Sequence, residues 1–349
     1  MTTEVPELPV RYYAKLFDLL DAVGFDTETL LQKAGISRRL LAKPDACLRL
    51  SQVEAFVDTA VAMGIRHDIA LDLGAMIKLS SHSMVGYAML SSPTVDYALR
   101  TASRFFRLIL PSFRMSCRHE DDRLVLEFTP VMPMSRLVMT FHLEAIASAV
   151  HHELREILRN AMPPYELYAS YAMPPHAARY AELMPGARCH FGWTARPGLR
   201  LVYPLEIAHF SPELADTAAL RMAENRCRTL VRNVVSDRRV SAWVLMMLRE
   251  AADSLLTLEE LAHTLNLSPR TLDRYLVQEN TGFRALRAQV HQERAQALLD
   301  NPALSITQIA HELGYTDASN FSRAYQRLTG QTPSAWRAAR LAGVGDDPV

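Results

Sequence analysis

The sequence predicts an α+β domain followed by an all-α domain, and three observations support this prediction. Up to about residue 220, helical patterns alternate with strand patterns, in which apolar residues recur at every second position. From about Asp216 to about Ala342 the patterns are helical throughout. In this second half a short helical pattern begins at Leu258 and is repeated from Ile306. The length of 349 residues, about twice that of an average domain, agrees with two domains.

The predicted α+β domain begins with helices. The segments "RYYAKLFDLLDAVG" and "LSQVEAFVDTAVAMG" place apolar residues at i, i+3, i+4 and i+7, and both end at a glycine. The segment "FRMSCRHEDDRLVLEFTP" predicts two strands around a polar turn at Glu120, Asp121 and Asp122. A long helix is predicted in "TFHLEAIASAVHHELREILRN", and three further strands in "YELYASYAM", "ARCHFGW" and "LRLVYPLE".

We expect the α+β domain to span residues 1–235, the all-α domain residues 236–341, and a C-terminal tail residues 342–349. The boundary is placed at "SDRRVSA", Ser236 to Ala242, because this polar and charged segment precedes a new amphipathic pattern. The final "GVGDDPV" has few apolar residues, and we expect it to be disordered.

Composition excludes several classes of protein. No apolar run approaches the ~18 residues of a membrane helix, and the N-terminus lacks the pattern of a secretory signal. The four cysteines are scattered without a C-x-x-C pair, so neither a metal cluster nor a disulfide framework is expected. We therefore expect a cytoplasmic protein that binds no membrane, metal or cofactor. The cysteines are Cys47, Cys117, Cys189 and Cys227.

The first copy of the repeat has the features of a helix-turn-helix. A short helix is followed by a turn at residues 266–268. Ser268 is expected to be the N-cap of the second helix and Pro269 its first residue, where the missing N–H costs nothing. The residues expected to be buried are Leu258, Leu261, Ala262 and Leu265 in the first helix and Leu272, Tyr275 and Leu276 in the second.

The second copy repeats this arrangement. Gly314 is expected to form the turn, Asp317 or Thr316 to cap the second helix, and Gly330 to end it. Pro333 is expected to begin a further helix, in which Trp336 holds the C-terminal end. The residues expected to be buried are Ile306, Ile309, Ala310 and Leu313 in the first helix and Phe321, Ala324, Tyr325 and Leu328 in the second.

Both second helices also carry polar and charged residues on the face opposite to the buried one. In a helix-turn-helix the N-terminal end of the second helix enters the major groove of DNA, where arginine can contact bases or phosphates. We therefore expect contacts with double-stranded DNA from Arg270, Thr271, Asp273 and Arg274 in the first copy and from Ser319, Asn320, Arg323 and Arg327 in the second.

Net charge supports this expectation only weakly. The formal charge of the chain is zero, and residues 257–341 contain nine arginines against eight acidic residues. Because many domains that bind phosphates are far more basic, DNA affinity is expected to depend on helix N-termini, backbone amides and a few arginines. Residues 221–250, with seven arginines against three acidic residues, are a second candidate basic region.

The segment "SITQIAHELGYTDASNFSRAYQRLTGQTPSAWR" and the copy upstream of it resemble the AraC/XylS family of bacterial transcription regulators, over roughly residues 240–340. The resemblance implies a seven-helix domain in which one long helix, here Phe283 to Leu299, joins two helix-turn-helices and places both recognition helices in successive major-groove turns about 34 Å apart. Asp273 would accept a hydrogen bond from a cytosine amino group or would orient Arg270 or Arg274. The implied base or phosphate contacts are Arg270, Asp273, Arg274, Ser319, Asn320 and Arg323.

The N-terminal half is similar to the arabinose-binding-type regulatory domain of one branch of this family. The similarity rests on "SSHSMVGYAMLSSPTVDYALRTASRFF" and "ARCHFGWTARPGLRLVYPLEIAHFSPELAD", and it does not imply a sugar ligand. It implies a homodimeric regulator controlled by a small-molecule effector in the N-terminal domain, with activation through contact with RNA polymerase. The alternative is control by a protein partner, with the N-terminal domain serving for dimerisation and interaction.

One predicted helix of the N-terminal half carries several histidines and glutamates. His152 and Glu156 would share a face, but zinc needs three or four ligands and no third is suggested. We interpret these residues as a polar flank of the helix, and since no phosphate loop or nucleophile motif is present we expect no enzyme activity. The set is His142, His151, His152, Glu153 and Glu156.

Methionines are plentiful in the same half. Such flexible apolar side chains suit an ordinary core or an adaptable apolar pocket, and the sequence leaves both interpretations open. They are Met76, Met84, Met89, Met115, Met132, Met134 and Met139.

Overall fold

The computed structural model describes residues 7–43, 46–159, 161–193, 196–231, 240–251, 256–265 and 267–343. The chain forms two compact units, one of residues 1–239 with the short segments 250–256 and 264–266, the other of residues 240–249, 257–263 and 267–349. The first is α+β and the second is all-α, which confirms the predicted fold class. Of the expected boundary, residues 236–239 lie outside the described residues, as do residues 344–349 of the expected tail.

Helices make up most of the α+β unit, and the three that the sequence predicts are confirmed as α1, α4 and α8. The helices are α1 (Val10–Ala22), α2 (Thr27–Ala34), α3 (Arg38–Leu41), α4 (Leu50–Ala62), α5 (Ile69–Met76), α6 (Met84–Leu90), α7 (Val95–Phe105), α8 (Arg136–Ile157), α9 (Ala178–Leu183) and α10 (Thr217–Val231). Short 3-10 helices are η1 (Leu79–His82), η2 (Phe106–Leu108) and η3 (Leu205–His209).

The main sheet contains five strands in the order β3-β4-β7-β5-β6, and they include all five that the sequence predicts. Neighbouring strands are antiparallel except β5 and β6, which are parallel and are connected through α9. Asp121, with φ 51°, forms the expected polar turn between β3 and β4. The strands are β3 (Phe113–Glu120), β4 (Arg123–Pro130), β5 (Tyr165–Ala169), β6 (Ala187–Phe191) and β7 (Leu199–Pro204), with a small separate sheet of β1 (Glu7–Pro9) and β2 (Cys47–Arg49).

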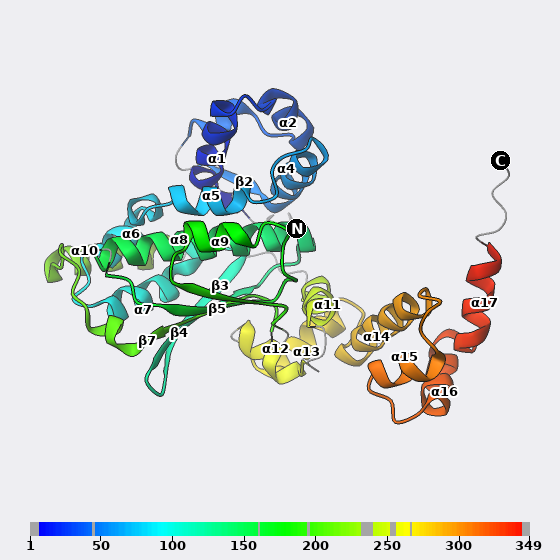
Figure 1. The fold of residues 1–349 in the computed structure, drawn as a ribbon. Coiled ribbons are helices and arrows are strands. Elements are labelled where there is room, and N and C mark those ends of the chain that lie inside the picture. Colours follow the sequence, from blue (N-terminus) through cyan, green and yellow to red (C-terminus); the bar gives the residue numbers. More distant parts are fainter. Residues whose placement is uncertain are drawn as a thin grey trace. The chain divides into compact units, whose positions relative to one another are not determined.

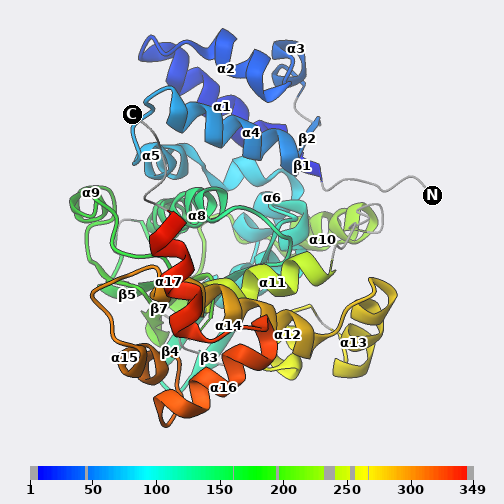
Figure 2. The ribbon, with the colours of Figure 1, turned by 90° about the vertical axis from the view of Figure 1, so that its right-hand side faces the viewer.

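The α+β unit is built in layers around α8. In Figures 1 and 2, helices α1, α2 and α4 lie over α5 and α8, and these in turn lie over the five-stranded sheet. Of the 22 residues of α8, 15 are buried, so this helix is enclosed on nearly every side. Helix α10, which follows the last strand in the sequence, also belongs to this unit, because its Leu220 and Ala223 pack against Ala88 of α6.

Helices α5 and α8 pack unusually closely, since Gly74 of α5 has no side chain to separate them. A Cβ placed on Gly74 would lie 2.6 Å from the Cβ of Ser148 and 2.9 Å from the backbone nitrogen of Ala149. The Ser148 hydroxyl also donates a hydrogen bond of 2.7 Å to the carbonyl oxygen of Leu71. The contact therefore fixes α5 directly against the backbone of α8.

The all-α unit contains α11 (Val240–Glu250), α12 (Leu258–Thr264), α13 (Pro269–Gln278), α14 (Phe283–Leu299), α15 (Ile306–Glu312), α16 (Ala318–Thr329) and α17 (Pro333–Gly343). Helix α14 has the bounds that the family resemblance implies for the connecting helix. Among the described residues, no helix is long and apolar enough to cross a membrane.

The substitution Gly74→Ala is expected to destabilise the α+β unit by about 1–3 kcal/mol, because the added methyl group overpacks the contact between α5 and α8. Urea unfolding followed by circular dichroism measures the loss. Ala62→Leu adds a larger side chain at an exposed position of α4 and is expected to change stability by less than about 0.5 kcal/mol. Equal stability of the two variants would contradict the close packing.

Candidate DNA-binding surface and ligand cavities

The first helix-turn-helix consists of α12 and α13, and its buried face largely follows the sequence prediction. Leu258 and Tyr275 are only half-buried, and the guanidinium carbon of Arg274 lies 5.6 Å from the centroid of the Tyr275 ring. A short helix pair exposes part of each apolar stripe, which accounts for both differences. The buried residues are Leu261, Ala262, Leu265, Leu272 and Leu276.

Helix α13 begins as the sequence predicts. The Ser268 hydroxyl accepts a hydrogen bond of 3.2 Å from the backbone N–H of Thr271, and Pro269 is the first helical residue. The turn before it includes a bond of 2.9 Å from the N–H of Leu267 to the carbonyl of Ala262, while Asn266 lies outside the described residues. The cap and the proline together fix the start of the helix.

The N-terminal turns of α13 carry the four residues expected to contact DNA. Arg270, Asp273 and Arg274 are exposed, and Thr271 is half-buried beside the Ser268 cap. Within the described residues, Asp273 forms no ion pair with either arginine. In the unbound chain Asp273 therefore does not orient them, and its contact with a cytosine amino group stays a prediction.

The second helix-turn-helix, α15 and α16, has a core of its own. Gly314, with φ 79°, forms the expected turn, and Gly330, with φ 81°, ends α16 in the left-handed conformation that glycine adopts without strain. Trp336 of α17 packs against this core as expected. The buried residues are Ala295, Leu299, Ile309, Ala310, Phe321 and Tyr325.

One expected core residue of α16 lies at the surface instead. Leu328 is 47% exposed, so its predicted burial is wrong. Its spacing from Phe321 and Tyr325 places it on the same face of the helix, but it lies in the last turn, and the core does not extend that far. Ala324 is half-buried.

Asp317 caps α16 and organises the residues expected to contact DNA. Its Oδ1 accepts a hydrogen bond of 2.7 Å from the backbone N–H of Asn320. The Asn320 amide nitrogen donates to Thr316 Oγ1 at 2.9 Å and to Asp317 Oδ2 at 2.8 Å, and its oxygen accepts from the Arg323 guanidinium at 2.6 Å. This chain of bonds holds the Arg323 side chain along the N-terminal end of the helix.

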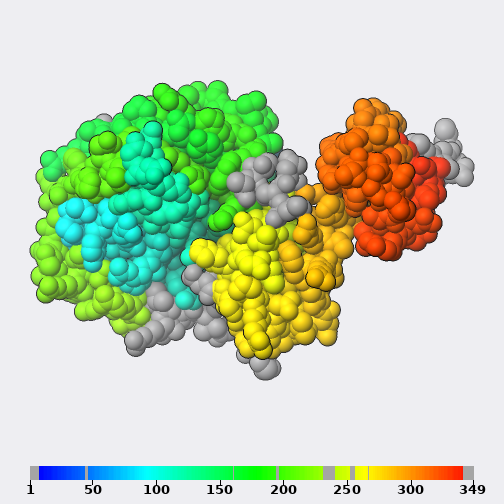
Figure 3. Space-filling model, turned by 90° about the horizontal axis from the view of Figure 1, so that it is seen from below, coloured from blue at the N-terminus to red at the C-terminus, as the bar shows by residue number. Residues whose placement is uncertain are grey.

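The expected contact residues of α16 are accessible. Ser319, Arg323 and Arg327 are exposed, and Asn320 is half-buried by the bonds that orient Arg323. Figure 3 shows that residues of α12 and α13 (yellow) and of α15 and α16 (orange to red) reach the molecular surface. Both second helices therefore offer arginine side chains to solvent on the face opposite to the buried one, as the sequence predicts.

Helix α14 is attached to both motifs. In its second half, Glu293 accepts two hydrogen bonds of 2.8 Å from Arg249 of α11, and Arg294 donates to the carbonyl oxygen of Leu248 at 2.9 Å. Helix α11 is in turn joined to the end of α13, where Glu279 accepts bonds of 2.9 Å from the backbone N–H groups of Val240 and Ser241. At its end, Leu299 lies in the core of the second motif and its carbonyl oxygen accepts a bond of 3.0 Å from Arg337 of α17. One helix thus supports both halves of the domain.

The near-zero charge of this unit is unevenly distributed. Several acidic residues either accept hydrogen bonds at the N-terminal ends of helices or pair with arginines that are not part of α13 or α16. The first kind are Glu260, Glu279 and Asp317, and the second kind are Glu293 and Asp300. Helices α13 and α16 themselves contain a single acidic residue, Asp273, against Arg270, Arg274, Arg323 and Arg327. The surface expected to face DNA is therefore more positive than the unit as a whole.

In the α+β unit, the interpretation of the α8 histidines and glutamates as a polar flank is wrong for three of the five. His142, His151 and Glu153 are 4%, 0% and 7% exposed, while His152 is half-buried and Glu156 exposed. Among the described residues, no three potential metal ligands come together. Sequence spacing did not reveal this burial, because the packing partners lie far away in the sequence.

Two series of hydrogen bonds accommodate these buried groups. The Tyr13 hydroxyl lies 2.8 Å from His142 Nε2, and His142 Nδ1 lies 2.8 Å from the carbonyl oxygen of Val138. Burial lowers the pKa of His142 to about 4, so the ring is neutral, Nδ1 donates to the carbonyl, and Tyr13 donates to Nε2.

The second series contains an ion pair. Tyr12 lies 2.8 Å from His82 Nδ1, and His82 Nε2 lies 2.5 Å from Glu153 Oε1. Burial acts to lower the pKa of His82, but the Glu153 carboxylate outweighs it and raises the pKa to about 10. His82 is therefore charged at neutral pH.

A central cavity of about 90 Å³ lies between α8, α1 and one face of the sheet. Its lining is almost entirely apolar, and it includes Met89 and Met115 from the methionines noted in the sequence. The polar residues at its edge belong to the two series above, where they are bonded to one another: Tyr12, Tyr13, His82, His142 and Glu153. All five of these polar residues therefore have hydrogen-bond partners, and the cavity is a gap in an apolar core.

A larger lateral cavity, of about 240 Å³, lies between α4, α8 and the segment after β5. Its walls are mostly apolar, but they include the buried carboxylate of Glu144 and the imidazole of His176. A concave apolar site with a few convergent polar groups is the usual form of a small-molecule site.

Comparison with known proteins follows the same division of the chain. Residues 24–208 match the family model described as the arabinose-binding domain of AraC transcription regulator, N-terminal, and residues 261–339 match a helix-turn-helix domain model. The chain is 26% identical over 332 residues to the ornithine utilization regulator of Pseudomonas aeruginosa, covering 95% of this chain and 96% of that protein.

Two further similarities have the same extent. The chain is 23% identical over 316 residues to the HTH-type transcriptional regulator VqsM of Pseudomonas aeruginosa, covering 86% of this chain and 93% of that protein. The crystal structure of the transcriptional regulator CdpR from the same species is 22% identical and covers 89% of this chain and 96% of that one, with a TM-score of 0.43.

Removing the cap of α16 is expected to cost about 1 kcal/mol of stability of the all-α unit. Asp317→Ala leaves the N–H of Asn320 without its acceptor and also loosens the chain of bonds to Arg323. Thermal unfolding measures the loss. Asp273→Ala, which removes an exposed acid that caps nothing, is expected to stay within about 0.5 kcal/mol, and the opposite order of the two variants would contradict the assignment of the cap.

Stability of the α+β unit is expected to fall as pH rises from about 6.5 towards 10. In this range the folded chain still holds a proton on His82, whereas the unfolded chain has released it. A raised folded-state pKa stabilises below the unfolded pKa, and this contribution is lost as pH passes the folded pKa. Urea unfolding at a series of pH values measures the slope. His82→Gln is expected to remove the part of the slope due to this pair, whereas the exposed control His209→Gln keeps it. An unchanged slope in His82→Gln would contradict a charged His82.

Proposed function

The chain belongs to the AraC-type transcription regulators, and on this premise we propose that a small-molecule effector bound to its arabinose-binding-type domain controls how its two helix-turn-helices contact DNA. The protein is a DNA-binding regulator of transcription. The observation that carries the proposal is the pair of helices α13 and α16. Each is capped, each has exposed arginines on its outer face, and both lie in the unit that contains α14.

The proposed DNA contacts combine base reading and phosphate binding. Arg270 and Arg274 of α13 and Arg323 of α16 are exposed planar donors that can form two parallel hydrogen bonds with guanine or with a phosphate. The N-terminal ends of both helices add partial positive charge from unpaired N–H groups. Thr271, Asp273, Ser319, Asn320 and Arg327 complete the proposed surface.

The effector is proposed to bind in the α+β unit. Of the two cavities described above, the central one has its five polar edge residues bonded to one another. The lateral one is larger, and His176 Nδ1 in its wall has no hydrogen-bond partner. Binding to one of two states of the regulator would shift their equilibrium by the difference in affinity. The name of the ornithine utilization regulator, a relative of this chain, is consistent with control by a small molecule. We further propose that the protein is a homodimer, activates transcription through RNA polymerase and acts in the cytoplasm.

Selection of genomic DNA fragments by the purified protein, at one fixed moderate salt concentration, tests the proposal. We expect recovered sites with two blocks of preferred sequence about one helical turn apart. Selection with and without candidate effectors then measures control by small molecules. Absence of stabilisation by any small molecule, together with effector-independent binding, would favour control by a protein partner instead.

Arg274→Ala and Arg323→Ala are each expected to cost about 1–3 kcal/mol of binding to a selected site if the arginine reads a base, and to relax the sequence preference there. A phosphate contact would instead weaken binding to all sequences about equally. Fluorescence anisotropy with labelled duplexes measures both effects. Arg340→Ala makes the same change of charge on α17, where the guanidinium pairs with Asp300 at 3.5 Å, and is the matched control. Wild-type affinity in both test variants would contradict the assigned surface.

A further inference from the structure

The lateral cavity is bounded by helices that meet at α8. Phe56, Val57 and Ala60 of α4 form one wall, and Phe141 of α8 forms the opposite one. Three of these are fully buried, with Phe56, Val57 and Ala60 at 1%, 3% and 2% exposed. The cavity therefore accepts a small apolar body between two helices of the same compact unit.

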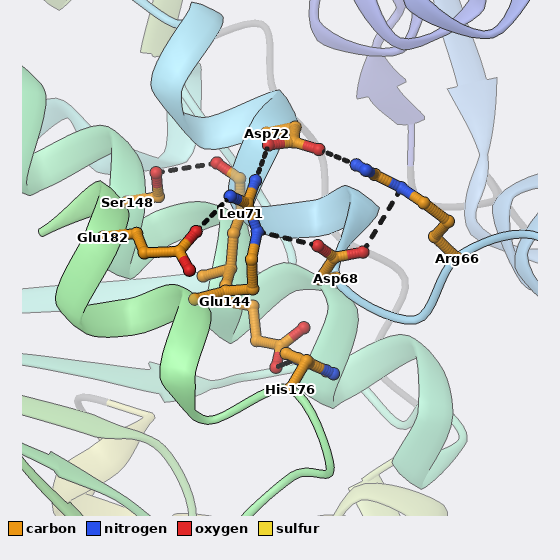
Figure 4. Close-up of polar contacts among 9 residues, drawn as sticks. Arg66, Asp68, Leu71, Asp72, Glu144, Ser148, His176 and Glu182 are labelled. Atoms are coloured by element: carbon orange, nitrogen blue, oxygen red, sulfur yellow. Dashed lines mark hydrogen bonds and ion pairs between the residues drawn. The ribbon is translucent and has the colours of Figure 1, made fainter. Parts of the chain in front are cut away.

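Its polar end is the carboxylate of Glu144, which is 2% exposed. Oε1 accepts both hydrogen bonds that this carboxylate receives, from His176 Nε2 at 2.7 Å and from the Tyr180 hydroxyl at 2.9 Å. Within the described residues, Oε2 receives none. In Figure 4 one Glu144 oxygen faces His176, and the other carries no dashed line. This buried residue thus has one carboxylate oxygen without a donor, in the wall of the cavity.

The imidazole of His176, beside Glu144, also has a polar atom without a hydrogen-bond partner. His176 also lines the cavity, and its Nδ1 is buried without a hydrogen-bond partner. When the proton of the neutral ring is on Nε2, where it bonds Glu144, Nδ1 is an acceptor. Thr140, one helical turn before Glu144 on α8, adds a hydroxyl to the same wall. Three oxygen or nitrogen acceptors therefore surround one end of the cavity.

The neighbouring arginines do not compensate the charge of Glu144. Arg179 binds Asp68 at 2.9 Å, Asp72 at 2.8 Å and Glu182 at 2.6 Å. Arg66, at the edge of the cavity, also pairs with Asp68 and Asp72 (Figure 4). Burial raises the pKa of Glu144 despite its bonds to His176 and Tyr180, as expected for a buried carboxylate short of positive charge.

We propose that the lateral cavity binds a small primary amine with an apolar body, whose ammonium group donates to Glu144 Oε2, to His176 Nδ1 and to the Thr140 hydroxyl. An ammonium group has three donors and a positive charge, which match the three acceptors and the uncompensated carboxylate. The proposal rests on the proposed function in assigning this amine the role of effector, but the site itself does not depend on that role.

The same surroundings disfavour an amino acid. Its α-carboxylate would need a cation, and Arg66, the arginine in the cavity lining, is already paired with two aspartates. Asp68 and Asp72 would also repel the carboxylate. The preferred class is therefore an alkyl or aralkyl amine without a carboxylate next to the ammonium group.

Isothermal titration calorimetry on the full chain at neutral pH tests this with three matched compounds: n-butylamine, butan-1-ol, which has no charge, and norvaline, which adds a carboxylate to the same body. At neutral pH the amine is protonated. We expect n-butylamine to bind about tenfold or more tightly than the other two, because a charge-assisted hydrogen bond to a buried carboxylate contributes most of the difference.

Variants localise the site. Glu144→Gln keeps the size of the side chain and removes its charge, and is expected to lower the affinity for n-butylamine by about tenfold or more. Val61→Phe fills the cavity from its rim without touching the buried polar groups, and is expected to abolish binding. Glu182→Gln, which alters the partner of Arg179 outside the cavity lining, is the control and is expected to bind normally.

Two results would overturn the proposal: no binding of n-butylamine to the folded wild-type chain, or equal binding by wild type and both Val61→Phe and Glu144→Gln. Measuring affinity for a selected DNA fragment in the same samples separates this proposal from the proposed function. DNA binding without amine binding overturns the amine site alone. Amine binding that leaves DNA affinity unchanged supports the site and contradicts its role as the effector site.

Discussion

Both DNA-binding motifs depend on one helix, α14, because contacts from its second half reach each of them. Glu293 and Arg294 tie it to α11, which Glu279 joins to the end of α13. Ala295 and Leu299 belong to the core of the second motif. Because closely spaced residues of one continuous helix of 17 residues contact both sides, the helix limits how far one motif can move relative to the other. In the proposed DNA complex, this constraint would set the separation of the two recognition helices.

The same logic explains how so neutral a domain can bind a polyanion. Acidic residues such as Glu279 and Asp317 cap helices, where they complement the helix dipole, and Glu293 is paired with Arg249. The recognition helices keep their arginines exposed. Affinity then depends on position rather than on total charge, and we expect a modest salt dependence compared with strongly basic domains.

In the α+β unit, α8 has the corresponding central place. It is buried on nearly every side, and it carries polar residues into the interior because other helices supply partners for them. Tyr13 satisfies His142, and His82 neutralises Glu153, so these positions stabilise the core without an obvious opening for a ligand. Glu144 differs because one of its oxygens has no partner in the part of the chain that the structure describes, and this difference is the basis for assigning a ligand to the lateral cavity.

The sequence predicted features that local signals determine. The Ser268 cap, the glycine at the end of α16 and the bounds of α14 follow from residue type and spacing within one or two turns. It could not predict the burial of His142 and Glu153, because their partners are 129 and 71 residues away. It also misplaced Leu328, since periodicity gives the face of a helix but not where the neighbouring core ends.

The most direct test of the account is the effect of spacing in the DNA site. On a selected fragment, 5 or 10 base pairs are inserted between the two blocks of preferred sequence, and affinity is measured by fluorescence anisotropy. If α14 fixes the separation of the recognition helices, both insertions weaken binding by about tenfold or more, because each removes one motif's base contacts. Undiminished affinity for either spacing would contradict a fixed arrangement of the two motifs.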